Sequence, residues 1–367
     1  MMMTVWNTVE LRNLCSRLSS GKNIAAKDIS EIGPYPVYGG NGIRGYTDTY
    51  NFDGECAIIG RQGAKCGNVR YFKGRAYMTE HAVVTCANDE NNTRFLAYLL
   101  GTMQLGRLSG QSAQPGLSVK TLGIQEVNVP DLLTQRQISC LLGEFDDLIE
   151  HNKVVNKNLE EQAQTIFDSF YEQADNEVPF TSLIQILGGG TPKTKVESYW
   201  NGDIPFFTPK DVGNPYTLST EKTITPTGLE HCSSRLYPIN TTFVTARGTV
   251  GKVSLAGAPM AMNQSCYALS GNNIHPLMTY FYTLKTIQSL RHKASGAVFD
   301  AIVTSDFKSE ILRCISENDS MQLLNSIEPM MDRILQGSVE NTRLAQLRDT
   351  LLPRLMSGEI DVSKIEV

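Results

Sequence analysis

The chain has 367 residues, of which 41% are hydrophobic and 19% charged, with a formal net charge of −5 at pH 7. This is an ordinary soluble composition, long enough for two domains with separate cores. The chain as a whole lacks the basic excess of most nucleic-acid-binding proteins, although a local basic cleft can supply the positive charge that such binding needs. With no signal-type N-terminus, no apolar run of about 18 residues and no C-x-x-C pair, the sequence predicts a cytoplasmic protein with reduced thiols and no metal site.

The first 130 residues or so are rich in glycine and in short strand-like runs. Residues 55–72 predict a strand, a glycine-rich turn and a second strand. Two further strand regions, at 76–86 and 116–130, flank a short helix predicted at 94–103.

A long heptad-patterned stretch occupies residues 134–171. Its apolar residues recur every three or four positions without an intervening proline, and Gly143 is its only glycine. One helix of this length would run about 60 Å at about 1.5 Å per residue, which is more than one compact domain needs. The pattern fits either a long core helix or a spacer that holds two modules apart. Asn152 lies at a seam position and is predicted to fix the register of pairing.

The segment 180–315 repeats the pattern of the first region. Residues 241–257 again predict strand, glycine-rich turn and strand, followed by a strand at 260–271 and a helix at 275–291. A second long periodic stretch begins at Ser320.

The rhythm of this second stretch weakens around Gly337. Pro329 and Pro353 are expected to kink the helix, because proline removes a backbone donor and clashes with the preceding turn.

One sequence offset relates the two halves. Arg61 aligns with Arg247 (247 − 61 = 186), and Ile149 aligns with Ile334 (334 − 149 = 185). Two more pairs of landmarks keep nearly the same spacing: Ser109-Gly110 with Ser295-Gly296, and Leu159 with Leu344. The chain is therefore a duplication of a globular module followed by a long helix, and a pseudo-twofold molecule is expected. Antiparallel pairing of the two helices would place the modules about 40–60 Å apart.

Several segments carry a resemblance to a known family. They are GGGTPKTKVESYWNGDIPFFTPKDV at 188–212, the long stretch 132–171, LRDTLLPRLMSGEIDV at 347–362, and GGNGIRGYTDTYNF at 39–52 followed by IIGRQGAKCGNV and TEHAVV. Over nearly its whole length, and with these segments in the right order, the chain resembles the specificity (S) subunit of type I restriction-modification systems.

The resemblance implies an α+β fold with two pseudo-symmetric mixed α/β target recognition domains, separated by two long antiparallel coiled-coil helices. The first recognition domain would span 1–132 and the first long helix 133–175. The second recognition domain would span 176–316, and 317–367 would hold the second long helix and a C-terminal tail.

The resemblance also implies a function. Each recognition domain would read one half of a bipartite double-stranded DNA target, and the helices would dock two modification (methyltransferase) subunits, which a restriction translocase can join. The S subunit itself would be non-catalytic and would bind no cofactor, while S-adenosylmethionine would be held by the modification subunit. The expected location is the cytoplasm of a bacterium or archaeon.

The motif content agrees with a non-catalytic chain. No N/D-P-P-Y motif is present, the nearest stretch being Asn214-Pro215-Tyr216, and no Walker A loop is found. Gly40, Gly42 and Gly45 satisfy G-x-G-x-x-G, but the residues after them cannot open an apolar-faced helix. These glycines therefore indicate a loop with positive φ angles in place of a dinucleotide site.

Base readout in a major groove requires Arg, Lys, Asn or Gln on stiff loops or strands, and phosphate contacts require Lys, Arg or backbone amides. The candidate DNA-binding residues on this ground are Arg44, Tyr46, Arg61, Gln62, Lys65 and His81 in the first half, and Lys193, Lys195, Lys210, Arg247, Lys252 and Gln264 in the second. For Arg61 and Arg247 a structural bond to a carboxylate stays open, and their recurrence favours structure or phosphate contact over base specificity. For His81 a satisfied hydrogen bond is favoured over a DNA contact.

Two other classes of function stay open. A self-sufficient methyltransferase or nuclease is disfavoured by the missing motifs. A two-headed protein-interaction scaffold without DNA specificity is compatible with the negative net charge.

Overall fold

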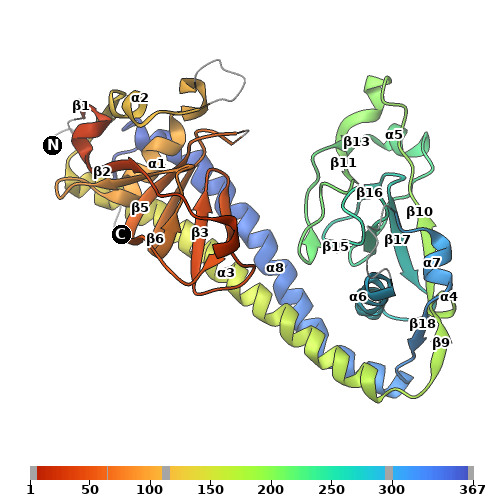
Figure 1. Cartoon of the computed structure of the whole chain (residues 1–367). Coiled ribbons are helices and arrows are strands. Elements are labelled where there is room, and N and C mark those ends of the chain that lie inside the picture. The colour runs from red at the N-terminus through yellow and green to blue at the C-terminus, as the bar shows by residue number, and fades with distance from the viewer. Residues whose placement is uncertain (1–5, 64, 110–115, 294–300, 363–367) are drawn as a thin grey trace. The chain divides into compact units, whose positions relative to one another are not determined.

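The structure, a computed structural model, describes residues 6–63, 65–109, 116–293 and 301–362 (Figure 1). The chain divides into two compact units, one made of Met1–Ile149 with Arg343–Val367 and the other of Glu150–Thr342. Of the repeat landmarks, Gly110 and the pair Ser295-Gly296 lie outside the described residues.

The first unit is built around a six-stranded sheet of order β2-β7-β5-β6-β3-β4, antiparallel except for the β3–β6 pair. Its strands are β2 (Cys15–Ser20), β3 (Tyr35–Gly39), β4 (Gly42–Thr47), β5 (Phe52–Gly60), β6 (Val69–Met78) and β7 (Ala82–Ala87). The central strand β5 is apolar from Cys56 to Ile59 because its two faces there lie in different cores. Ala57 and Ile59 face one cluster, and Cys56 and Ile58 face the other.

Helices and a small second sheet complete the first unit. They are α1 (Thr93–Thr102), α2 (Val119–Gly123), the 3-10 turns η1 (Leu11–Leu14), η2 (Ala26–Asp28) and η3 (Leu105–Leu108), and the antiparallel pair β1 (Asn7–Glu10) and β8 (Glu126–Val129). Two sequence predictions are corrected here. The strand predicted at 76–86 is the end of β6, a turn and β7, and the stretch 116–130 contains α2 because Ser118 caps a helix by accepting from Thr121 N at 2.9 Å.

The second unit repeats this plan with smaller sheets. One sheet has the order β10-β17-β14-β15-β12, a second β13-β11-β16, and a third pairs β18 with β9. Its strands are β9 (Glu177–Pro179), β10 (Ile184–Gly188), β11 (Trp200–Phe207), β12 (Tyr216–Thr217), β13 (Thr223–Ile224), β14 (Thr242–Thr245), β15 (Val253–Ala256), β16 (Ala261–Met262), β17 (Cys266–Gly271) and β18 (Ile311–Arg313). Its short helices are α4 (Phe180–Leu183), η4 (Glu197–Tyr199), α5 (Pro226–Glu230), α6 (Pro276–Lys293) and α7 (Thr304–Lys308).

Matching hydrogen bonds show which residues of the two units are equivalent. Leu117 N donates to Arg61 O, and Ile302 N donates to Ala246 O, both at 2.9 Å. The offset is 185 in each case (302 − 117 and 246 − 61). Arg61 is therefore equivalent to Ala246, and Arg247 lies one residue further on. The sequence alignment of Arg61 with Arg247 was wrong by one residue, because it matched like side chains across turns of different length.

The long helices are α3 (Leu132–Gln173) and α8 (Glu317–Met356). Their buried and half-buried seam positions alternate in steps of four and three: 138, 142, 145, 149, 152, 156, 159, 163, 166 and 170 in α3, and 323, 327, 330, 334, 337, 341, 344, 348, 351 and 355 in α8. The helices are antiparallel, because Asn152 contacts Asn341 whereas Asn156 contacts Ser338 (Figure 1). α8 continues through Pro329 and Pro353, so neither proline ends it.

The middle of this seam is polar. Its polar residues come from both helices, and all of them belong to the second unit. Asn152 Nδ2 donates to Glu340 Oε2 at 2.9 Å and to Asn341 Oδ1 at 3.1 Å. Asn156 Nδ2 donates to Ser338 Oγ at 3.3 Å. A Cβ on Gly337 would lie 2.8 Å from Asn156 Oδ1, so the glycine makes room for the asparagine. This polar layer agrees with the register role predicted for Asn152.

The equivalent helices α1 and α6 are fixed to α3 by different chemistry. In the first unit, Arg94 of α1 donates to both carboxylate oxygens of Asp147 at 2.9 and 2.7 Å and to Gly143 O at 3.0 Å. The Arg94 hydrogen bond and charge lower the pKa of the Asp147 carboxyl. A Cβ on Gly143 would lie 2.7 Å from Arg94 Cζ, which explains the single glycine of α3.

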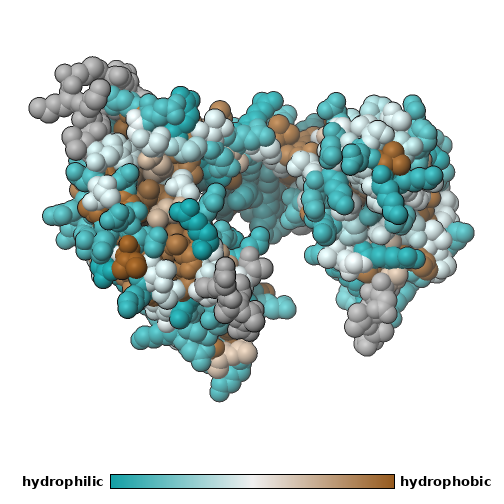
Figure 2. Space-filling model, turned by 90° about the horizontal axis from the view of Figure 1, so that it is seen from above, coloured by the Kyte–Doolittle hydropathy of each residue, from teal (hydrophilic) through white to brown (hydrophobic). Residues whose placement is uncertain are grey.

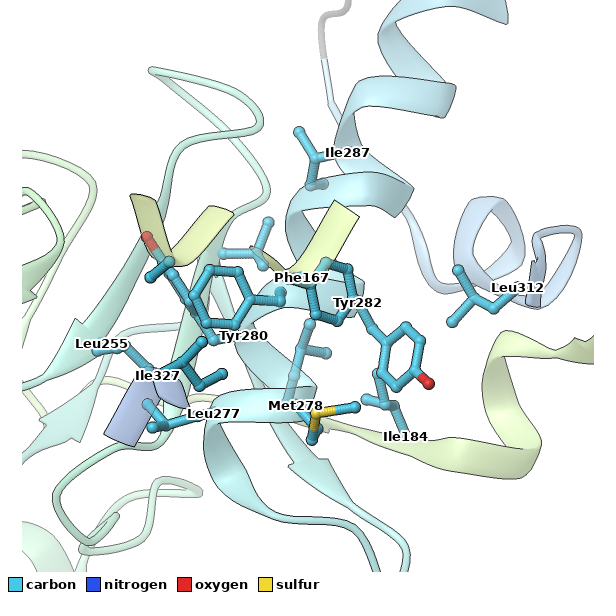
Figure 3. Close-up of a cluster of buried hydrophobic side chains, with 14 of the residues drawn as sticks. Phe167, Ile184, Leu255, Leu277, Met278, Tyr280, Tyr282, Ile287, Leu312 and Ile327 are labelled. Carbon is cyan, nitrogen blue, oxygen red and sulfur yellow. The ribbon is translucent and has the colours of Figure 1, made fainter. Parts of the chain in front are cut away.

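In the second unit the corresponding contact is mainly aromatic, beside one ion pair in which Lys285 Nζ of α6 lies 3.0 Å from Asp168 Oδ1 of α3. Phe167 of α3 stacks on Phe281 of α6 with ring centroids 5.1 Å apart and meets Tyr282 edge-on at 5.4 Å. These rings lie in the buried cluster of Figure 3, which also includes Tyr280 and Ile327. Beside the cluster, burial raises the pKa of the Glu160 carboxyl, to which Tyr280 is hydrogen-bonded at 3.5 Å.

Candidate nucleic-acid interface

A glycine turn in the first unit brings several candidate residues together. The turn joins β3 to β4, and Gly39 pairs with Gly42 across it. A Cβ on Gly40 would lie 3.1 Å from His81 O, 3.3 Å from Gln62 O and 3.7 Å from Arg61 N. The turn therefore rests directly on the backbone of Arg61, Gln62 and His81.

The glycines of this turn are required for two reasons. Gly42 and Gly45 have φ angles of +108° and +147°, as predicted for a loop with positive φ. Gly40 has no such angle and is instead a site of close backbone approach.

Arg44 and a further arginine lie on the same turn. A Cβ on Gly39 would lie 2.6 Å from Arg44 Cδ, and a Cβ on Gly42 would lie 3.4 Å from Arg70 Cζ. Sequence reasoning missed Arg70, since it follows the turn by 28 positions (70 − 42) and carries no motif. The one indication in the sequence was the alternation of Val69, Arg70 and Tyr71, which is typical of a strand with one exposed face.

Arg61 is half-buried, and its Nη1 lies 3.4 Å from Ser20 Oγ. Among the residues that the structure describes, neither Arg61 nor Arg247 forms an ion pair with a carboxylate. The structural alternative for these two arginines, a bond to an internal carboxylate, thus finds no support in the described parts of the modules.

His81 has a partner inside the module. Its Nε2 lies 3.1 Å from Glu80 Oε1, and the satisfied, hydrogen-bonded histidine stays a prediction. The other carboxylate oxygen, Glu80 Oε2, is buried without a partner in the described structure.

Two further candidates of the first unit are Tyr46 and Lys65. Tyr46 is half-buried further along β4, where it pairs with Pro36 and forms a bridge to Ser30. Lys65 is exposed and lines a separate surface pocket of about 430 Å³ together with residues 66–68 and 104–107.

In the second unit, the turn that follows Arg247 packs against Pro209, the residue before Lys210. Thr249 Oγ1 donates to Pro209 O at 3.1 Å, and a Cβ on Gly248 would lie 3.7 Å from Pro209 Cβ. Arg247 is exposed, and Lys210 Nζ lies 3.9 Å from Glu221 Oε2. Because that pair is 80% and 61% exposed, it neutralises the lysine only weakly.

Gln264 is held by the G-G-T-P segment. Thr191 Oγ1 donates to Gln264 Oε1, which leaves the Nε2 amide of this exposed side chain as a donor toward solvent. Gly189 approaches the backbone of Asn263 so closely that a Cβ could not fit.

The lysines of the second unit are spread out. Lys193, Lys195 and Lys252 are exposed and form no ion pair within the described residues. Lys193 O accepts from Trp200 Nε1 at 3.3 Å, which fixes the backbone but not the ammonium group. Lys252 follows the turn after β14, where its backbone N donates to Thr245 Oγ1 at 2.9 Å.

Figure 2 shows hydrophilic side chains predominating on the face seen from above, with hydrophobic ones scattered among them. The described residues include no group of three or more His, Cys, Asp or Glu side chains placed to hold a metal ion. Across the same parts of the chain, no helix has the length and apolar character needed to span a bilayer.

The comparisons with known proteins agree on one family. A family model described as the type I restriction modification DNA specificity domain matches residues 3–161 and 176–313. The type I restriction enzyme EcoprrI specificity subunit of Escherichia coli is 42% identical over 136 residues, which cover 36% of this chain and only 34% of that relative. The HindI specificity subunit of Haemophilus influenzae is 22% identical over 327 residues, covering 67% of this chain and 71% of the relative.

A solved structure shares the fold. The S subunit of a type I restriction-modification system from M. genitalium matches over 96% of both chains, with a TM-score of 0.63 and 15% identity. This likeness confirms the predicted α+β architecture of two mixed modules with two long antiparallel helices. With one match of the family model in each half, the chain belongs to the family of type I restriction-modification DNA specificity subunits.

Proposed function

We propose that this chain selects the DNA sequence for a type I restriction-modification complex. Each module would bind one half of a bipartite double-stranded target, and the α3–α8 pair would dock two modification subunits, with restriction subunits able to join them. The chain would supply no catalytic group, and S-adenosylmethionine would bind to the modification subunit.

One observation carries the proposal. Equivalent turns of the two units present the exposed cations Lys65 and Arg247, and each turn lies beside a loop that carries Glu80-His81 or Gln264. Cations without carboxylate partners suit phosphate contacts, and a held glutamine amide suits base-edge readout.

The test is reconstitution. The purified chain alone should not methylate DNA in the presence of S-adenosylmethionine, whereas the chain with its modification subunit should methylate one bipartite sequence. Sequencing of methylated bases would identify that target. A chain that never binds a modification subunit, or a complex that methylates without sequence preference, would contradict the proposal and favour a protein-interaction scaffold.

A further inference from the structure

We propose that Arg44, Arg61 and Arg70 of the first unit form a phosphate clamp around the glycine turn Gly39–Gly42. The clamp deepens the proposed DNA-binding function and rests on it. Its most distinctive member is Arg70, which belongs to no motif.

Two of the three arginines lie against glycine backbone. Arg44 runs over Gly39, so that an added Cβ there would lie 2.6 Å from its Cδ and 3.0 Å from its Cγ. The Arg70 guanidinium lies over Gly42, with Cζ, Nη2 and Nε at 3.4, 3.5 and 3.6 Å from an added Cβ. Both glycines are buried while both arginines are exposed, so the turn lies beneath the two side chains and the charged groups remain accessible to solvent.

The third arginine lies at the base of the same turn. An added Cβ on Gly40 would lie 3.7 Å from Arg61 N, and the Gly40 carbonyl closely approaches Gly60 at the end of β5. The turn is thus fixed on the Arg61 backbone, while the half-buried Arg61 guanidinium extends to Ser20 Oγ at 3.4 Å and supplies a third positive charge at this end of the module.

These three side chains form no ion pair among the described residues. Several other arginines of the unit have carboxylate partners, among them Arg12 with Glu10, Arg75 with Asp53, and Arg94 with Asp147. Arg44, Arg61 and Arg70 have none among the described residues, and Glu80, whose Oε1 lies 3.1 Å from His81 Nε2, forms an ion pair with none of the three. Like charges held near one another repel, and a bound anion removes that cost.

A DNA phosphate is the anion that fits. Guanidinium groups bind phosphate oxygens through paired N–H donors, and a glycine turn allows a sugar–phosphate backbone to approach closely. The second unit lacks this arrangement, since the position equivalent to Arg70 is the buried Ser254 (254 − 70 = 184). The clamp is therefore a property of the first module.

The experiment measures the salt dependence of binding to a random-sequence duplex by fluorescence anisotropy, with the full-length chain. Arg44→Gln and Arg70→Gln should each reduce the slope of log K against log salt by about 0.9. Between 50 and 200 mM salt, that corresponds to about a 3.5-fold smaller change in affinity per contact. Arg70→Lys should keep the wild-type slope, because lysine binds phosphate as a point charge.

Arg75→Gln is the matched control. It lies on the same strand, is exposed and is already paired with Asp53, so its slope should equal that of the wild type. Thermal unfolding of every variant checks that the sheet remains folded.

Two results would overturn the clamp while leaving the proposed function intact. They are a wild-type slope in Arg70→Gln, or a slope in Arg70→Lys that falls as much as that of Arg70→Gln. A wild-type chain and reconstituted complex that bind no duplex at any salt concentration would overturn both.

Discussion

Gly337 offers the sharpest test of how α3 and α8 fit together. Replacing a glycine in the interior of a helix by alanine ordinarily stabilises it by about 1 kcal/mol. At Gly337 the new Cβ would lie 2.8 Å from Asn156 Oδ1 and 3.0 Å from Arg333 Nη1. The Asn156 side chain would have to move away from the other helix.

The cost follows from the hydrogen bonds that would be lost. Asn156 is 9% exposed, and its Nδ2 donates to Ile334 O and Ser338 Oγ, both at 3.3 Å. Leaving a buried amide unsatisfied costs about 1–3 kcal/mol. Subtracting the helix gain, we expect Gly337→Ala to destabilise the chain by up to about 2 kcal/mol. The control Gly101→Ala in α1, where nothing lies within 4 Å of an added Cβ, should be stabilising.

The assay is urea unfolding followed by circular dichroism, run as a double-mutant cycle with Asn156→Ala. The coupling energy between the two changes should be about 1 kcal/mol or more, because the Cβ added at position 337 no longer clashes once the Asn156 side chain is removed. The reasoning would be refuted if Gly337→Ala stabilised the chain as much as Gly101→Ala does, or if the two changes were additive.

Three further predictions concern charge, spacing and readout. The depressed pKa of Asp147 contributes stability above its unfolded value near 4, and that stability is lost as pH falls through the folded pKa. Asp147→Asn should therefore flatten acid unfolding below about pH 4 relative to wild type. Deleting one heptad within 142–162 and one within 327–347 should shorten the gap of the bipartite target and leave both half-sites unchanged, as read by methylation mapping of the reconstituted complex. Altered half-sites with an unchanged gap would show that the helices read DNA. Gln264→Ala should relax base preference in one half-site only, and unchanged preference in a binding-site selection would assign this residue a structural role.

The large elements of the fold could be predicted from the sequence. α3 begins and ends within two residues of the predicted 134–171, because a long heptad pattern specifies a long helix that packs on a partner helix. The short elements were harder. β7 was merged with the end of β6 because the turn at Thr79–His81 contains neither glycine nor proline.

The candidate interface could be predicted only for residues that lie close together in the sequence. Arg44, Arg61 and Gln62 lie in or next to glycine-rich stretches, and composition pointed to them. Arg70 joins them through the pairing of β6 with β3 and β5, a contact between distant segments that no periodicity encodes. The exact equivalence of Arg61 with Ala246 likewise required hydrogen bonds, because the glycine turns differ in length.

The two ways in which the modules are attached to α3 give the duplicated halves different sensitivities. The contact of Arg94 with Asp147 is electrostatic, and Asp147 is 72% exposed, so added salt weakens it. The contact of Phe167 with Phe281 is fully buried and apolar, so cooling weakens it while salt leaves it largely unchanged. The second unit also joins α6 to α3 through Lys285 and Asp168, but this pair is less exposed than Arg94 with Asp147. The duplicated halves thus differ in the solution conditions that loosen them, and an increase in ionic strength acts more strongly on the first half.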